Sequence, residues 1–67
     1  MTKEDFNNLK PGMLIHRIVS NPVELLLILT IKLSKAKDRN VLGVWSFYEQ
    51  RTYSARTEHC DFYEIAQ

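Results

Sequence analysis

Cysteine is almost absent from this chain of 67 residues, in which Cys60 is the only one. A single cysteine excludes an internal disulfide and a zinc site built from cysteines alone. An apolar core, or a second copy of the chain, must therefore supply the stability of so small a domain. The hydrophobic fraction of 45% is ordinary for a globular protein. These features predict one domain, residues 1–67.

Glycine is also scarce, because the chain holds only Gly12 and Gly43, each isolated. This spacing excludes a glycine-rich phosphate loop. The soft metal ligands are His16, His59 and Cys60, without the spacing of a metal site. His59 and Cys60 are sequence neighbours, and neighbours in an extended segment point apart. Cys60 could in principle act as a nucleophile activated by His16 or His59, but a cysteine more commonly has a structural role. We predict no enzyme, no cofactor and no metal.

The chain has no large excess of charge and no long apolar run. The formal net charge is +1, so the overall balance gives no support to nucleic-acid binding. The longest apolar run spans roughly a dozen residues, whereas a membrane-spanning helix needs about 20. Residues Met1–Asp5 carry acids and do not resemble a secretory signal. We expect a cytoplasmic protein without a membrane segment, and the start methionine predicts a complete small gene product.

The most informative segment is Val23–Leu33. Its odd positions are all apolar: Val23, Leu25, Leu27, Leu29, Ile31 and Leu33. Its even positions are polar at both ends and apolar in the middle: Glu24, Leu26, Ile28, Thr30 and Lys32. Because successive side chains of a strand point to opposite faces, this period of two predicts a long, bent strand. The odd face is expected to meet the core throughout, and the even face to be buried only at its centre.

A helix is the alternative for this segment. Asn21, Pro22 and Glu24 resemble a helix start, with asparagine as the cap and proline at the first position. A helix over Val23–Leu33, however, would be apolar on every side. A protein of this size cannot surround such a helix, so the pattern favours the strand.

The remaining elements follow from turn and cap signals. Thr2 predicts the cap of a short helix over Lys3–Asn8, and Lys10–Met13 predicts a turn in which Gly12 takes a positive φ. Gly43 indicates a bulge or sharp bend. The predicted strands are Met13–Val19, Val23–Ser34, Val41–Glu49, Thr52–Thr57 and Phe62–Ile65, with a turn or single helical turn over Glu58–Asp61.

The order of these segments resembles a known architecture. It reads LKPGMLIHR, then VELLLILTI, NVLGVWSFYE, RTYSARTE and a terminal DFYEI. This order is similar to that of the small SH3-like barrels of short bacterial and phage proteins, with Gly12, Trp45 and Phe62–Ile65 in matching places. The resemblance implies a mainly β fold, a small five-stranded SH3-like barrel with a short N-terminal helix. It also implies a binding module, such as a phage-type regulator or inhibitor of a host protein, without catalytic residues.

Aromatic and leucine-rich residues supply the candidate partner surface. Trp45 and Phe47 share one face of their strand and are interpreted as barrel filling. Tyrosine hydroxyls prefer a wet edge, so tyrosines are better surface candidates. Where the barrel leaves the even face of the long strand uncovered, an apolar patch would call for a partner protein or a second copy. The expected partner-binding residues are Leu26, Ile28, Tyr48 and Tyr53.

Nucleic-acid binding is the alternative function. A polar loop after the long strand carries several cations, and a local cluster can neutralise phosphates even when the net charge is small. Acidic neighbours dilute this cluster, and a solvated loop of mixed charge is the commoner interpretation. The residues assigned to the alternative are Lys35, Lys37, Arg39 and Arg51.

Overall fold

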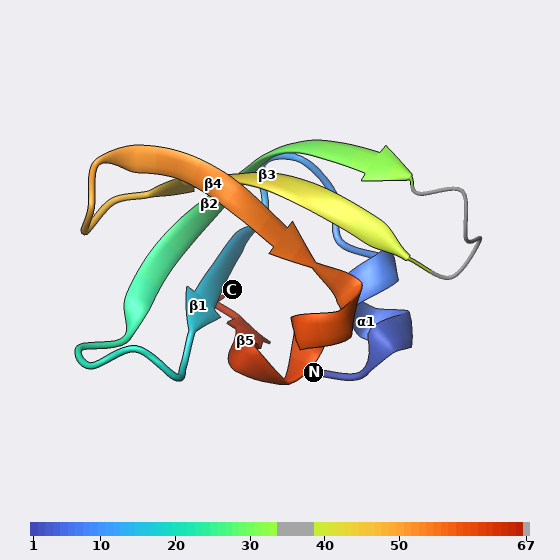
Figure 1. The fold of residues 1–67 in the computed structure, drawn as a ribbon, viewed down its shortest axis with the longest axis horizontal. Helices are drawn as coiled ribbons and strands as arrows, with labels where there is room; N and C mark the ends of the chain where they lie inside the picture. Colours follow the sequence, from blue (N-terminus) through green and yellow to red (C-terminus); the bar gives the residue numbers. More distant parts are fainter. Residues whose placement is uncertain (34–38, 67) are drawn as a thin grey trace.

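The computed structural model describes residues 1–33 and 39–66 of the chain. Its fold is mainly β, with a short helix at the start and a 3-10 helix before the last strand (Figure 1). The elements are α1 (Lys3–Asn7), β1 (Leu14–Arg17), β2 (Glu24–Leu33), β3 (Asn40–Ser46), β4 (Arg51–Arg56), η1 (Thr57–Phe62) and β5 (Tyr63–Ile65). The prediction that the leucine-rich segment is a strand is therefore confirmed, and the helix alternative is wrong.

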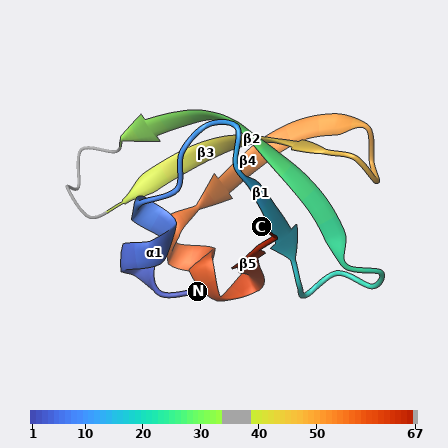
Figure 2. The ribbon, with the colours of Figure 1, turned by 180° about the vertical axis from the view of Figure 1, so that it is seen from behind.

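The five strands form one open antiparallel sheet in the order β4-β3-β2-β1-β5. The first and last strands pair with each other, and β4 and β5 are the two edges. The sheet is strongly curved, and both α1 and η1 lie on its concave side (Figure 2). One face of the sheet is thus covered by helical segments, while no described element covers the convex face. In the described part of the chain, no helix has the length and apolar character needed to cross a membrane.

The short local predictions are confirmed. The side chain of Thr2 accepts a hydrogen bond from the backbone N–H of Asp5 at 3.1 Å, which caps α1. Gly12 has a φ of 90°, and the N–H of Met13 donates to the carbonyl of Lys10 at 3.2 Å, so the predicted turn is present. The helical segment predicted over Glu58–Asp61 is present as η1, but it is longer than a single turn, is kinked at His59, and includes Thr57 and Phe62, which were predicted to lie in strands.

The two faces of β2 are the reverse of the predicted ones. Glu24, Leu26 and Ile28 point into the core and are at most 5% exposed. Leu25 and Leu27, which the odd-face prediction placed in the core, are only half-buried on the convex face. The prediction that the odd face meets the core throughout is therefore wrong, and so is the expectation that both ends of the even face lie in water, because Glu24 is buried.

A β-bulge at Leu29 limits the reversal to the first half of β2. Ile28 pairs with Val44, whereas Thr30 already pairs with Gly43, so Leu29 is one residue in excess. An extra residue moves every later side chain to the other face of the strand. Ile31 accordingly packs against the core, as the odd face was predicted to do. The predicted bulge is present, but it lies in the strand opposite Gly43, where a Cβ would collide with the Thr30 hydroxyl.

The core fills the space between the concave face and the helical segments. It consists of Phe6, Leu9, Ile15, Leu26, Ile28, Leu42, Val44, Ala55, Cys60 and Tyr63. Cys60 is thus a buried thiol. Thr57 joins three elements there: its hydroxyl accepts from the N–H of Asn40 at 2.7 Å and donates to Asn7 Oδ1 at 2.8 Å. These bonds satisfy polar groups that would otherwise be buried without partners.

Candidate functional site

The antiparallel order brings polar side chains from several strands to one end of the sheet. β1 ends with Arg17, β2 begins with Glu24, β3 ends with Ser46 and β4 begins with Arg51. The register pairs Arg17 with both Glu24 and Tyr63, and Ser46 with Arg51. All these positions share the concave side of the sheet, because they lie directly opposite one another across the strands. A site can form here from residues that are far apart in the sequence.

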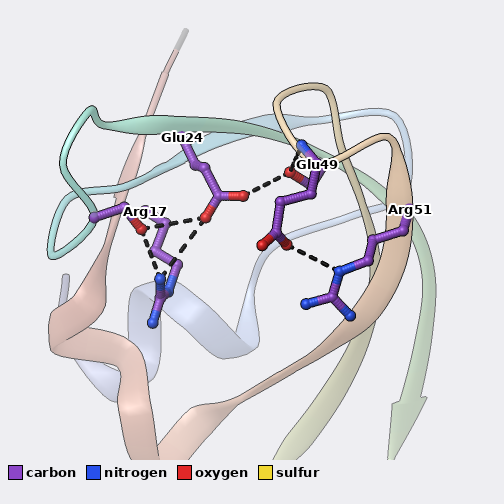
Figure 3. Close-up of polar contacts among 6 residues, drawn as sticks. Arg17, Glu24, Glu49 and Arg51 are labelled. Carbon is purple, nitrogen blue, oxygen red and sulfur yellow. Dashed lines mark hydrogen bonds and ion pairs between the residues drawn. The ribbon is translucent and has the colours of Figure 1, made fainter.

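Glu24 is the buried centre of this end. The Ser46 hydroxyl donates to Glu24 Oε1 at 2.6 Å, and the Ser20 hydroxyl donates to Oε2 at 3.2 Å (Figure 3). Arg17 lies 3.7 Å from the same Oε2 and donates to the Ser20 hydroxyl at 2.6 Å. A buried carboxylate is tolerated when it is paired and hydrogen-bonded in this way. The network also fixes the position of the Arg17 guanidinium.

A second ion pair lies beside the first and is far more exposed. Arg51 Nε donates to Glu49 Oε2 at 3.1 Å, and the two side chains are 62% and 39% exposed (Figure 3). Exposed pairs of this kind contribute only about 0–1 kcal/mol to stability. The Arg51 guanidinium also lies 5.5 Å from the centre of the Tyr53 ring. The end of the sheet therefore has one rigid arginine and one that can exchange its partner at little cost.

A pocket of about 380 Å³ opens between these two ion pairs and η1. Its aromatic wall comes from the 3-10 helix and the strands that flank it, through His59, Phe62, Tyr53 and Tyr63. The rings of His59 and Phe62 are stacked, with centroids 5.1 Å apart and planes 7° apart. The volume lies at the lower end of the range for sites of small ligands.

The hydroxyl of Tyr53 is buried at this pocket and has no hydrogen-bond partner among the described residues. Burial, followed by the nearby negative charge of Glu24, raises the pKa of Tyr53 to about 12. Burial likewise raises the pKa of Tyr63, against the opposing effect of the Arg17 guanidinium. Both phenols therefore stay protonated at neutral pH and keep an O–H to donate.

The raised pKa of Tyr53 predicts a loss of stability in alkali. The unfolded chain releases this proton near the ordinary tyrosine pKa of about 10, whereas the folded chain holds it to about 12. The free energy of unfolding should therefore fall as the pH rises from about 10 towards 12. Denaturant unfolding across this range, with Tyr53→Phe as the control, measures the effect. An equally steep fall in Tyr53→Phe would contradict it.

The convex face of the sheet is a second candidate surface. Leu14, Leu27 and Trp45 lie directly opposite one another on β1, β2 and β3. Leu25, two residues before Leu27 on β2, lies on the same face. All four are half-buried, although no described element covers them. The neighbouring Phe47, whose N–H donates to the Leu25 carbonyl at 3.3 Å, is 48% exposed. We call Leu14, Leu25, Leu27 and Trp45 the convex apolar patch.

Basic side chains border this patch at one end. The register places Val41 between Lys32 on β2 and Arg56 on β4. Val41 lies four residues before Trp45 on β3, so it shares the convex face at a distance of about 13 Å along the strand. Lys32 and Arg56 are both exposed. The convex face thus has an apolar centre, positive charge beyond one end, and the pair of His16 and exposed Glu64 beside Leu25.

The structure does not bring the four predicted partner-binding residues to one surface. Leu26 and Ile28 are 0% and 1% exposed, so the prediction that they bind a partner is wrong: the concave side covers them. Tyr53 also faces the concave side, whereas Tyr48 is 68% exposed in the turn after β3. The interpretation of Trp45 and Phe47 as core residues is also wrong, because Trp45 lies on the convex face of β3 and Phe47, in the turn after β3, is 48% exposed.

The residues assigned to nucleic-acid binding are dispersed or lie outside the described part of the chain. Lys35 and Lys37 belong to the residues that the structure does not describe. Arg39 is exposed near Lys3 and Glu58, and Arg51 is paired with Glu49. Within residues 1–33 and 39–66, no three His, Cys, Asp or Glu side chains gather as a metal-binding group.

Sequence reasoning missed the pocket. Its charged members, Arg17 and Glu24, flank the segment that joins β1 to β2, and opposite charges on the two sides of a hairpin are a usable signal. The contributions of His59 and Phe62 had no such signal, since they come from a segment more than 30 residues later.

Comparisons with known proteins do not assign a family. No protein-family model, no curated protein and no solved structure matches this chain. The function must therefore be argued from the two surfaces themselves.

Proposed function

We propose that this protein is a non-enzymatic protein-interaction module that binds its partner through the convex apolar patch. The single observation that carries the proposal is the row Leu14, Leu27 and Trp45 on a sheet face that no described element covers. A contiguous apolar area on a small monomeric domain marks an interaction site more often than a scattered set of side chains does. Tryptophan and leucine at the centre of such an area are suited to bury against another protein.

The chemistry of the patch indicates the kind of partner. Lys32 and Arg56 lie on the same face beyond one end of the apolar centre, about 13 Å along β3 from Trp45. A partner that spans both would carry carboxylates at some distance from an apolar strip. The four residues of the convex apolar patch supply anchors for a partner, and none of them is a nucleophile or a metal ligand. The pairing of β1 with β5 and the strong curvature of the sheet support an SH3-like barrel of the bacterial or phage type as part of the same proposal.

Site-specific photo-crosslinking tests the proposal. A photoreactive residue in place of Leu27, in cells of the source organism, should give one discrete adduct with another protein. The same residue in place of Glu58, exposed on η1 on the concave side, should not. Arg56→Glu should reduce the Leu27 adduct by about threefold, because it places like charges opposite the partner. Arg39→Glu, an exposed arginine elsewhere, is the matched control and should leave the adduct unchanged.

The other outcomes overturn the proposal in distinct ways. An adduct of twice the mass of the chain would identify a second copy as the partner. An adduct that nuclease destroys, and that falls steeply with salt, would favour the nucleic-acid alternative. Equal adducts from positions 27 and 58 would show that the convex face has no preferred partner.

A further inference from the structure

The pocket at the end of the sheet has unfilled hydrogen-bond donors. Both oxygens of Glu24 are occupied, by Ser46 on one side and by Ser20 and Arg17 on the other. In contrast, Arg51 donates through its Nε alone among the described residues, and no hydrogen bond is drawn to its terminal nitrogens (Figure 3). The Tyr53 O–H also has no partner in the described chain.

These free groups favour a ligand with acceptors. A guanidinium carries only donors, and the hydroxyl of Tyr53 remains protonated at neutral pH. A cationic ligand is disfavoured here. The Tyr53 ring could attract a cation, but the Arg51 guanidinium already lies over that ring and would repel it. An anionic ligand can instead replace Glu49 on Arg51, since that exposed pair contributes little.

The rest of the pocket adds an aromatic wall. Phe62 is 37% exposed and lies flat against His59, while the Tyr63 ring is tilted to that of Phe62 with the centroids 6.5 Å apart. Such rings pack against a planar apolar group. A volume of about 380 Å³ holds a single ring with a short acidic substituent rather than a large cofactor.

We propose that this pocket binds a carboxylate held next to an aromatic ring, with Arg51 and Tyr53 on the carboxylate and the His59–Phe62 stack on the ring. The Arg17–Glu24 pair forms the other side of the pocket. The ligand enters at the exposed Arg51–Glu49 pair, and side chains around the Tyr53 hydroxyl, which is closed to solvent, must shift as Glu49 leaves Arg51. This site is separate from the convex apolar patch and does not depend on the proposed function.

Two kinds of ligand have a carboxylate beside an aromatic ring. One is a free aromatic acid, and the other is the C-terminal carboxylate of a peptide whose last residue is aromatic. Phenylacetate serves as the probe for the first, and N-acetylphenylalanine for the second. N-acetylphenylalaninamide, which lacks the charge, is the ligand control. Each is titrated into the full chain, and the backbone amide resonances of residues 59–63 are followed by NMR.

The expected result is saturable binding of at least one acid, with a Kd of about 1 mM for a ligand of this size, and no saturable binding of the amide. Arg51→Gln should weaken binding by about tenfold, and Tyr53→Phe by about threefold, because each removes one donor to the carboxylate. Arg56→Gln, on the same strand but on the convex side, is the matched control and should bind as the parent does.

The comparison of the two acids decides the source. Tighter binding of N-acetylphenylalanine supports a peptide terminus, and tighter binding of phenylacetate supports a free acid. Binding of the amide as tight as that of the acids, or unchanged affinity in folded Arg51→Gln, would overturn the proposal. Resonance shifts that never saturate would overturn it as well. None of these outcomes bears on crosslinking from the convex face, so the two proposals fail separately.

Discussion

Leu26→Ala is expected to lower the free energy of unfolding by about 3 kcal/mol, because it removes a fully buried side chain and leaves a cavity. Leu27→Ala removes the same atoms from the next residue of β2, which is half-buried on the convex face. Its expected cost is about 1 kcal/mol, since most of the lost contacts are with Leu14 and Trp45. Denaturant unfolding followed by circular dichroism measures both.

The comparison tests which face of β2 is the core. A domain of this size rarely has more than about 3–5 kcal/mol of stability, so Leu26→Ala can fall below the folding threshold. Leu26→Val, a smaller deletion with an expected cost of about 1 kcal/mol, then gives a measurable point. A larger loss for Leu27→Ala than for Leu26→Ala would mean that the odd positions face the core after all.

Glu24→Ala should cost a similar amount, about 3 kcal/mol, for an electrostatic reason. The Ser46 hydroxyl is fully buried and would lose the acceptor that lies 2.6 Å away. Arg17 would lose its counter-charge, although its side chain is 36% exposed and keeps some contact with water. The unfolding free energy from denaturant titration is again the measurement.

The neighbouring exposed ion pair provides the control. Glu49→Ala removes a carboxylate from Arg51 and should change the stability by no more than about 0.5 kcal/mol, because that pair is already in water. The stability loss of Glu24→Gln should lie between the losses of Glu24→Ala and Glu49→Ala, since the amide oxygen still accepts a hydrogen bond from Ser46. Equal losses for Glu24→Ala and Glu49→Ala would show that the Glu24 network contributes nothing beyond a surface ion pair.

Local signals in the sequence were sufficient to predict the short helix, the turn and the leucine-rich strand. The Thr2 cap, the Gly12 turn and a helical segment before the last strand each depend on interactions within a few residues. The strand over the leucine-rich segment followed from a period of two and from the inability of a small domain to enclose an apolar helix. The structure contains all four features.

The same period of two did not determine which face of that strand is buried. Both faces are apolar in the middle, so hydrophobicity alone leaves the register open. The register with β1 and β3 places Leu26 inside and Leu27 outside, and the bulge at Leu29 then turns Ile31 inside. The choice of buried face, which the sequence left open, thus accounts for the error in the expected partner surface.

The sequence by itself determined that this chain forms strands with a short capped helix, because those choices depend on neighbours along the backbone. Tertiary structure alone decided that Glu24 is buried, because its tolerance there depends on Ser46, which lies 22 residues away. It also decided which side chains meet in the pocket, since Arg51 and Phe62 come together with Arg17 only when β1, β4 and η1 are folded around one core. Contacts of this range have no period along the chain from which they could be inferred.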